Sequence, residues 1–330
     1  MFDLITFGSA TQDIFLKPRS FRIVGEKKFI TGKGLCLSLG SKIDVKDIFF
    51  LSGGGGSNTA AAFAKQGFKI AFCGMVGADP AGEETIKELK RIGVDTKFVK
   101  KTKKKLTNHS VILASDNQER TILVYRGASS ELTTKEIPWF GLKAKWLYLA
   151  PLSGRLCNVF EKLVNFAWKN KMKVALNPGH SQLSLSQKTL TRILKKVDIL
   201  ILNQEEASFL SQIPFNKEKE IFRKIDKLCP GIAIMTKGPL GVVVSDGKFL
   251  YRAGALKTKA IDRTGAGDAF ASGFISGFIR KKGNIEYAIQ LATANSAACL
   301  REFGAKKGLL AKNQKFRKVK IFKEKCLGNN

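Results

Sequence analysis

The chain has 330 residues, 44% of them hydrophobic and 25% charged, which is typical of a globular protein and excludes a disordered one. Its 57 Lys and Arg residues outnumber 27 Asp and Glu residues, giving a formal net charge of +30. The lysines are spread along the whole chain, so we expect solvated basic faces and no nucleic-acid partner. No apolar run approaches about 18 residues, and Asp3 stands where a signal peptide would be basic. We therefore expect a cytoplasmic protein without a membrane segment.

Short apolar runs that predict strands alternate with segments that predict helices along most of the chain. The predicted strands are apolar on both faces and cover residues 3–9, 69–76, 145–152, 173–178, 197–203 and 231–238. The predicted helices cover residues 58–66, 81–92, 156–170, 187–195, 205–211 and 217–228. This alternation predicts an α/β fold, with a doubly wound, mostly parallel sheet covered by helices on both faces.

Two segments interrupt this alternation, residues 14–52 and 107–127, because they lack helix periodicity. In the second segment, two β-like runs flank the polar turn DNQE, which is a hairpin signal. We expect these segments to form a small β-sheet lid, inserted into a domain of residues 1–308, that excludes water from a reaction. Residues 309–330 form a basic, weakly patterned tail, which we expect to be a surface helix or partly disordered.

The stretch IDRTGAGDAFASGF, residues 261–274, allows two interpretations. Glycines 265 and 267 would let backbone N–H groups converge on an anion, at the start of a helix predicted from Ala266. Asp268 would then lie in the first turn, where the helix end favours its ionised form and it could accept a proton from an alcohol. Thr264 could cap the helix or contact phosphate. The alternative is a tight glycine turn with an acidic first turn and no ligand.

A second glycine cluster lies in LSGGGGSNTAAAFAKQG, residues 51–67, where Asn58 would begin a helix of small residues. The glycines would allow close approach to a ligand, and Asn58 could bind hydroxyls; a flexible, capped loop is the alternative. Asp13 follows the first predicted strand, where open α/β sheets bind ligands and a carboxylate can accept hydrogen bonds from two hydroxyls of a polyol. A surface or turn aspartate explains Asp13 equally well.

Two further motifs follow later strands. Asn203 and Glu206 have the N-x-x-E spacing of a helix capping box, but they could also lie around a magnesium ion, which prefers oxygen ligands. Thr236 and Gly238, in MTKGPLGV, could hold nucleotide phosphates or ribose, or could form a plain hairpin.

In combination, GGGGSN, NQEE, TKG and DRTGAGDAF resemble, in this order, the motifs of the PfkB (ribokinase) family of carbohydrate and nucleoside kinases, over residues 1–305. The resemblance implies a ribokinase-like fold, ATP and Mg²⁺ as cofactors and, in part of the family, K⁺. It also implies a role for each motif residue. These are Asp268 as catalytic base; Gly265, Ala266 and Gly267 as anion hole; Asp13, Gly54, Gly55 and Asn58 as acceptor-binding residues; Asn203, Thr236, Gly238 and Asn295 as ATP-binding residues; Glu206 for Mg²⁺ through water; and Asp262 for K⁺.

The sequence departs from the family pattern at three places. Arg263 stands where a small residue is usual, the interval from Asn295 to Gly304 is short, and residues 20–50 exceed a minimal lid. We expect an ATP-dependent kinase that phosphorylates a hydroxyl of a sugar, of the ribokinase or fructokinase type. A nucleoside kinase that stacks its base on Phe15, Phe21 or Phe29 is the alternative. A catalytically silent nucleic-acid-binding protein is expected less, and a homodimer paired through the lid is implied by resemblance alone.

Overall fold

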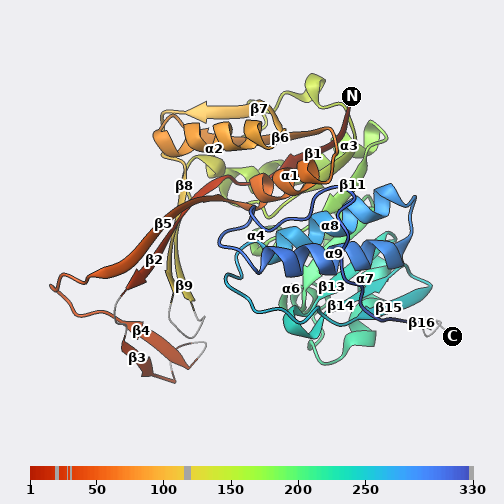
Figure 1. Cartoon of the computed structure of the whole chain (residues 1–330). Coiled ribbons are helices and arrows are strands. Elements are labelled where there is room, and N and C mark those ends of the chain that lie inside the picture. The colour runs from red at the N-terminus through yellow and green to blue at the C-terminus, as the bar shows by residue number, and fades with distance from the viewer. Residues whose placement is uncertain (19–21, 28, 30–31, 115–119, 327–330) are drawn as a thin grey trace.

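A computed structural model describes residues 1–18, 22–27, 29, 32–114 and 120–326 of the chain. Within these residues, the strands form a ten-stranded sheet, a four-stranded sheet and a two-stranded ribbon. Figure 1 shows the four-stranded sheet and the ribbon projecting from the body that holds the large sheet. This arrangement confirms the predicted α/β fold with a small separate β-sheet.

The large sheet has the strand order β16-β15-β14-β13-β12-β11-β10-β1-β6-β7. Its parallel strands are β1 Phe2–Phe7, β6 Ile70–Gly77, β7 Asp95–Thr102, β10 Ala144–Leu149, β11 Lys173–Leu176, β12 Ile199–Asn203 and β13 Ile232–Thr236. Three antiparallel strands, β14 Val242–Ser245, β15 Phe249–Ala253 and β16 Ile321–Lys325, extend one edge. All eight residues of β6 are buried, as the run of apolar residues predicts for a central strand.

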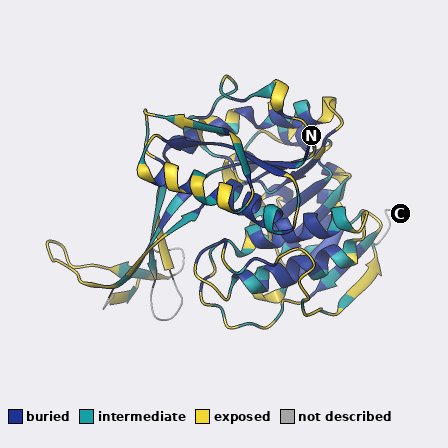
Figure 2. Cartoon of the chain, turned by 45° about the horizontal axis from the view of Figure 1, so that its top comes forward, coloured by how far each residue is buried: buried dark blue, intermediate teal, exposed yellow. Residues whose placement is uncertain are grey.

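Helices cover both faces of this sheet, and each face has its own apolar core (Figure 2). One face is covered by α1 Gly55–Lys65, α2 Pro80–Arg91, α8 Ala266–Arg280 and α9 Ile285–Cys299. The other is covered by α3 Phe160–Lys169, α4 His180–Leu183, α5 Gln187–Leu194, α6 Gln204–Ser211 and α7 Glu218–Leu228. Within the described residues, no helix is both long and apolar enough to cross a membrane.

The four-stranded sheet is the lid, with the order β5-β2-β8-β9. Its strands are β2 Thr11–Pro18, β5 Val45–Gly53, β8 Asn108–Ala114 and β9 Arg120–Tyr125, and the ribbon is formed by β3 Arg22–Gly25 and β4 Lys33–Cys36. The expected hairpin is present as the antiparallel pair of β8 and β9. Its DNQE turn, residues 116–119, and Phe21 lie outside the described residues. The lid joins the body where β5 ends and α1 begins.

The C-terminal tail differs from the expected surface helix or disordered segment. Leu309 and Leu310 are buried against the helices, and β16 pairs antiparallel with β15 as an edge strand of the large sheet. An edge strand forms through backbone hydrogen bonds to its neighbour and does not require alternating apolar residues, so its lysines can stay solvated. Lys323, for example, lies over the rings of Phe249 and Tyr251. The described residues after Gly308 therefore pack against the same body as the residues before it.

Candidate active site

Asp268 and Asn58 lie together, although they come from motifs at opposite ends of the chain. Asn58 Nδ2 on α1 donates a hydrogen bond of 2.8 Å to Asp268 Oδ2 on α8. Asn58 Oδ1 is buried and has no hydrogen-bond partner within the described residues. A buried acceptor of this kind costs free energy unless a ligand satisfies it. The pair thus offers a carboxylate and an unused amide oxygen at one point.

The glycine cluster allows this close packing. Gly54, which precedes α1, has φ 95°, and a Cβ there would lie 2.5 Å from the carbonyl oxygen of Ser9. A Cβ on Gly55 would lie 3.3 Å from Ala150 Cβ and 3.5 Å from Asp268 Oδ1. Side chains at these positions would therefore push α1 away or fill the space beside the Asp268 carboxylate.

Asp13 lies in the lid and not at the end of the first strand. It is the third residue of β2, where it pairs with Leu51 of β5, and its side chain is 6% exposed. Its carboxylate occupies the space that a Cβ on Gly53 would need. Burial raises the pKa of Asp13 to about 6, although a hydrogen bond from Ser110 and the charge of Lys306 act in the opposite direction.

Asp268 is half-buried in the first turn of α8. Burial raises the pKa of this carboxyl, and the Asn58 hydrogen bond and the Lys306 charge oppose that shift. Burial, which raises the pKa of Asp268, therefore acts against the helix end, which favours the ionised carboxylate. A base whose pKa is raised toward neutrality accepts a proton from an alcohol more readily.

Gly265 and Gly267 take different roles at the start of α8. Gly265 is the N-cap residue in the left-handed region, φ 74°, and a Cβ there would overlap Ala305. A Cβ on Gly267 would meet no atom within 4 Å, so the backbone here faces open space. Thr264 does not cap the helix, because its hydroxyl accepts from Arg120 Nη1 and donates to Asp262 Oδ1, both at 2.8 Å. The Ala266 N–H donates a long hydrogen bond of 3.4 Å to the Arg263 carbonyl oxygen, and the N-terminus of a helix favours an anion.

A cavity of about 720 Å³ extends from this helix end to the turn after β13. Thr236 and Gly238 line it together with Ala266 and Gly267, so four residues predicted from separate motifs share one space. The cavity is also lined by Lys257, Lys259 and Arg263, which sequence analysis did not place. The signal for them was the basic loop KTK just before the glycine motif. Three cations beside a helix N-terminus suit a polyphosphate.

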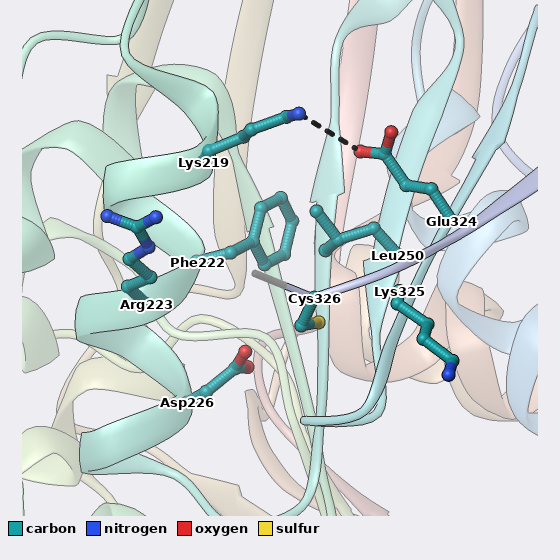
Figure 3. Close-up of a pocket in the computed structure, with 8 residues that line it drawn as sticks. All are labelled: Lys219, Phe222, Arg223, Asp226, Leu250, Glu324, Lys325 and Cys326. Atoms are coloured by element: carbon teal, nitrogen blue, oxygen red, sulfur yellow. Dashed lines mark ion pairs between the residues drawn. The ribbon is translucent and has the colours of Figure 1, made fainter. Parts of the chain in front are cut away.

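A second, much smaller cavity lies at the β16 edge of the sheet (Figure 3). Its volume of about 20 Å³ has room for about one water molecule. Residues of α7, β15 and β16 line it together with Cys326, and Phe222 is among them. It is too small for a nucleotide or a sugar.

Asn203 and Glu206 form a complete capping box at the start of α6. Asn203 Oδ1 accepts from the Glu206 N–H at 2.8 Å, and Glu206 Oε2 accepts from the Asn203 N–H at 2.9 Å. Asn203 also pairs with Thr236 across β12 and β13, which places it beside a residue that lines the cavity of about 720 Å³. Burial raises the pKa of Glu206, as expected for a carboxylate without a cation nearby. Asn203 and Glu206 thus form the capping box. A half-buried carboxylate such as that of Glu206 is also suited to holding Mg²⁺ through a water molecule.

Asp262 is 8% exposed and is already engaged by several donors. Its Oδ1 accepts from Arg120 of the lid at 3.1 Å and from the Thr264 backbone at 2.9 Å, and Oδ2 accepts from Gly304 N–H at 3.0 Å. The cation beside Asp262 is therefore a guanidinium, which does not fit the expected K⁺ site. Within the described residues, no group of three or more His, Cys, Asp or Glu side chains could hold a metal ion.

Asn295 does not line the cavity of about 720 Å³, which contradicts the expected contact with adenine or ribose. Its Nδ2 donates to the Ala269 carbonyl and its Oδ1 accepts from the Leu310 N–H, both at 2.8 Å. Thr293, Ser296 and Ala297 line the cavity instead, because they share the opposite face of α9. Asn295 fastens α9 to α8 and to the C-terminal segment.

Comparison with known proteins identifies the class to which this fold and site belong. The sequence model for the pfkB family carbohydrate kinases matches residues 25–312, and the chain belongs to this family. It is a carbohydrate kinase.

The similar curated sequences include ribokinases and a fructokinase. The chain is 29% identical to the ribokinase of Haemophilus influenzae over 268 residues, which cover 78% of this chain and 83% of that one. It is 29% identical to the ribokinase of Lactococcus lactis over 272 residues, covering 82% and 86%. It is 27% identical to the probable fructokinase-5 of Arabidopsis thaliana over 276 residues, covering 77% and 83%.

Solved structures share the fold at low sequence identity. The ribokinase of Arabidopsis thaliana, complexed with ribose and ATP, superposes with a TM-score of 0.77 at 21% identity, covering 93% of this chain and 95% of that one. The ribokinase of Cryptococcus neoformans, in complex with ADP, gives 0.72 at 21% identity, covering 94% and 97%. The nucleoside kinase of Methanocaldococcus jannaschii gives 0.75 at 20% identity, covering 93% and 95%.

Proposed function

We propose that this carbohydrate kinase transfers the γ-phosphoryl group of ATP to a hydroxyl of a sugar of the ribokinase or fructokinase type, with Asp268 as the general base. The observation that carries the proposal is the contact of Asn58 with Asp268, which leaves the buried Asn58 Oδ1 unused beside the base. An acceptor hydroxyl bound there would donate to Asn58 Oδ1 or to Asp268. The same position lies at the N-terminus of α8, where the phosphates would end.

The proposed reaction follows from these positions. Asp268 takes the proton of the acceptor hydroxyl as its oxygen attacks the γ-phosphorus, and the N–H groups of Gly265, Ala266 and Gly267 stabilise the charge on the transferring group. Asp13 binds further hydroxyls from the lid side, with the backbone of Gly54 and Gly55 facing the acceptor. Electrostatic stabilisation of this kind contributes most of the rate in phosphoryl transfer.

For the nucleotide, we propose the cavity lined by Thr236, Gly238 and Arg263, with Asn203 at its edge. Mg²⁺ would be held by Glu206 through water, and when bound it would neutralise charge on the β- and γ-phosphates. Asn295 and K⁺ at Asp262 are not part of the proposal, because Asn295 is satisfied in the interior and Asp262 pairs with Arg120. We propose that the kinase domain includes the C-terminal tail through residue 326.

A nucleoside acceptor is the second candidate, because the nucleoside kinase of Methanocaldococcus jannaschii shares the fold. The base of a nucleoside would need an aromatic side chain of the lid on which to stack. Phe15 is 4% exposed and packs edge-on against Phe303 at 6.3 Å, so it belongs to the lid core. Phe29 is exposed in the ribbon of β3 and β4. The placement of Phe15 favours the sugar.

A coupled ADP-release screen tests the acceptor. The panel is ribose, fructose, fructose phosphates, adenosine, inosine and cytidine, and Asp268→Asn is the control for contaminating kinases. The proposal expects rapid ADP release with ribose or fructose and none of it in the Asp268→Asn protein. Faster release with adenosine, inosine or cytidine would establish the second candidate instead.

We also propose a homodimer formed through the lid. Apolar side chains of β5 and β9 are exposed on one face of the lid, among them Ile48 at 49%, Phe50 at 58% and Leu123 at 56%. A sheet face of this kind is normally covered by another surface. Light scattering after size exclusion should give twice the chain mass of 36.3 kDa. A monomer at micromolar concentration would contradict the dimer.

We also propose that the protein is located in the cytoplasm, as the sequence leads us to expect.

A further inference from the structure

Lys306 is a buried cation beside the acceptor site, and the mechanism above does not use it. Its side chain is 5% exposed, and among the described residues it is the one buried cation; the other buried charges are Asp13 and Asp262. Burying an ammonium costs several kcal/mol even when it has a partner. An apolar side chain of similar size would fill this position at no greater cost. The charge itself therefore needs an explanation.

The ammonium is held by contacts from two separate elements, α2 and β5. Lys306 Nζ lies 3.1 Å from Glu88 Oε2 on α2, and it donates to the Ser52 hydroxyl on β5 of the lid. Ser52 donates in turn to Glu88. The Lys306 backbone is fixed as well, because Lys65 Nζ on α1 donates to its carbonyl oxygen at 2.9 Å. The charge cannot move far without breaking this cluster.

Residues 52–58, which include the Ser52 that binds the Lys306 ammonium, also contact both carboxylates of the acceptor site. Ser52 binds Lys306, Gly53 leaves the space that the Asp13 carboxylate occupies, and Asn58 donates to Asp268. Residues 52–58 thus gather two anions and one cation around the place proposed for the acceptor. Two carboxylates that share a poorly solvated site oppose each other's ionisation unless a cation is near.

We propose that Lys306 is a positioning residue for phosphoryl transfer, which supplies the positive charge that Asp13 and Asp268 share and so keeps both carboxylates available to the acceptor. This inference rests on the proposed function. Asp13 can then accept from hydroxyls while Asp268 accepts the transferred proton. Glu88 and Ser52 hold the ammonium but do not contact the acceptor.

The electrostatics of the neighbouring groups agree with this assignment. Burial lowers the pKa of Lys306, and Glu88, Asp13 and Asp268 oppose that shift. The interaction is mutual. The charge of Lys306 lowers the pKa of Asp13 and of Asp268, against the effect of burial on both carboxyls.

Other groups face these carboxyls too and are counted in the test. Asp262 raises and Arg120 lowers the pKa of Asp13. Tyr148 and Cys299 lie near Asp268, and burial raises the pKa of both, so they stay neutral through the working range. None of them is a cation that acts on both Asp13 and Asp268.

The direct test titrates the two carboxyls in the whole protein. Carboxyl ¹³C resonances of labelled aspartate are followed against pH and assigned with Asp13→Asn and Asp268→Asn. Lys306→Met leaves Glu88 without its partner and can fail to fold for that reason. The double variant Lys306→Met/Glu88→Gln removes both charges together and avoids this. Lys307→Met, an exposed lysine in the same segment, is the matched control.

In the double variant we expect both carboxyls to titrate about one pH unit higher than in the wild type, and no change in the Lys307→Met control. The acid limb of kcat/KM should move upward by the same amount, and Lys306→Arg should restore it. Unmoved titrations in a folded double variant, with activity lost equally at every pH, would overturn the proposal and leave a structural ion pair. The titration needs no acceptor, so it decides this point even where the acceptor screen fails.

Discussion

Asn58 Nδ2 and Asp268 Oδ2 are joined by a hydrogen bond of 2.8 Å across 210 positions of sequence. This contact places the end of the lid strand β5, the start of α1 and the first turn of α8 around one point. It also supports the ligand-binding interpretation of each glycine motif over the capped turn. Each motif alone could be a capped turn, but turns that serve only as caps have no reason to meet.

Asp268→Asn should abolish turnover while leaving the fold and ligand binding nearly intact. The substitution keeps the shape and the contact with Asn58 but removes the proton acceptor, so kcat should fall by about 10²–10⁴-fold. Steady-state kinetics with the acceptor found in the screen measure this, and calorimetry measures acceptor and ATP affinity. A kcat within a factor of about three of the wild type would exclude Asp268 as base.

Asp13→Asn should weaken acceptor binding and, at neutral pH, stabilise the protein. The folded pKa of Asp13 is raised from 3.8 to about 6, so its protonated form is favoured by folding. Its contribution to stability is fully present below about pH 3.8 and is lost as the pH rises through about 6. Removing the charge should therefore stabilise the fold at pH 7.5 by up to about 3 kcal/mol.

The check on Asp13 is a pair of denaturant titrations, one at pH 7.5 and one at pH 4. The free energy of unfolding of Asp13→Asn should exceed that of the wild type at pH 7.5, and the gain should be much smaller at pH 4. The KM for the acceptor should rise by about tenfold or more. Equal gains at both pH values would show that the effect does not come from ionisation of Asp13.

Gly265→Ala and Gly267→Ala should separate folding from catalysis at neighbouring positions. Gly265 has φ 74° and no space for a Cβ beside Ala305, so the substitution should destabilise the protein by about 1–3 kcal/mol. Gly267 has open space at its Cβ position, so stability should stay within about 0.5 kcal/mol of the wild type. The new methyl group would point into the nucleotide cavity and lower kcat/KM for ATP by about tenfold or more. Thermal unfolding and kinetics of both variants check this, and the reverse pattern would contradict the proposed anion hole.

Arg263→Met should weaken ATP binding without affecting the acceptor. Arg263 lines the nucleotide cavity with Ala266 and Gly267, so its guanidinium should pair with a phosphate. We expect the KM for ATP to rise about tenfold and to depend less on salt. Arg91→Met, at an exposed arginine of α2 that pairs with Glu84, is the matched control. Equal effects of the two substitutions would mean that Arg263 contributes only to the general positive field.

Sequence analysis was most successful where a local pattern decides the structure. The central strands of the large sheet are buried on both faces and are continuous apolar runs in the sequence, as in β6. The N-x-x-E spacing likewise predicts the capping box that Asn203 and Glu206 form. Glycine motifs were equally informative, because φ 95° at Gly54 and φ 74° at Gly265 require this residue type.

The residues that sequence analysis missed depend on contacts between distant segments. Nothing in the local sequence distinguishes Lys306 from the exposed Lys307; only the packing of the segment after α9 against α2 and β5 buries one and not the other. Asn295 shows the opposite case. Its amide looked free to bind a ligand, but Ala269 and Leu310 satisfy it in the interior.

Removal of residues 309–330 should destabilise the whole domain, because the tail is part of its structure. Leu309 and Leu310 are buried, Gln66 Nε2 donates to the Leu310 carbonyl at 2.7 Å, and β16 covers the edge of β15. Loss of two buried leucines alone costs about 4 kcal/mol or more. Truncation after Gly308 should therefore lower the melting temperature by at least about 10 °C or prevent soluble expression. Truncation after Cys326 keeps every contact described above and is the control; similar stability of the two truncated chains would show that β16 and the buried leucines are dispensable.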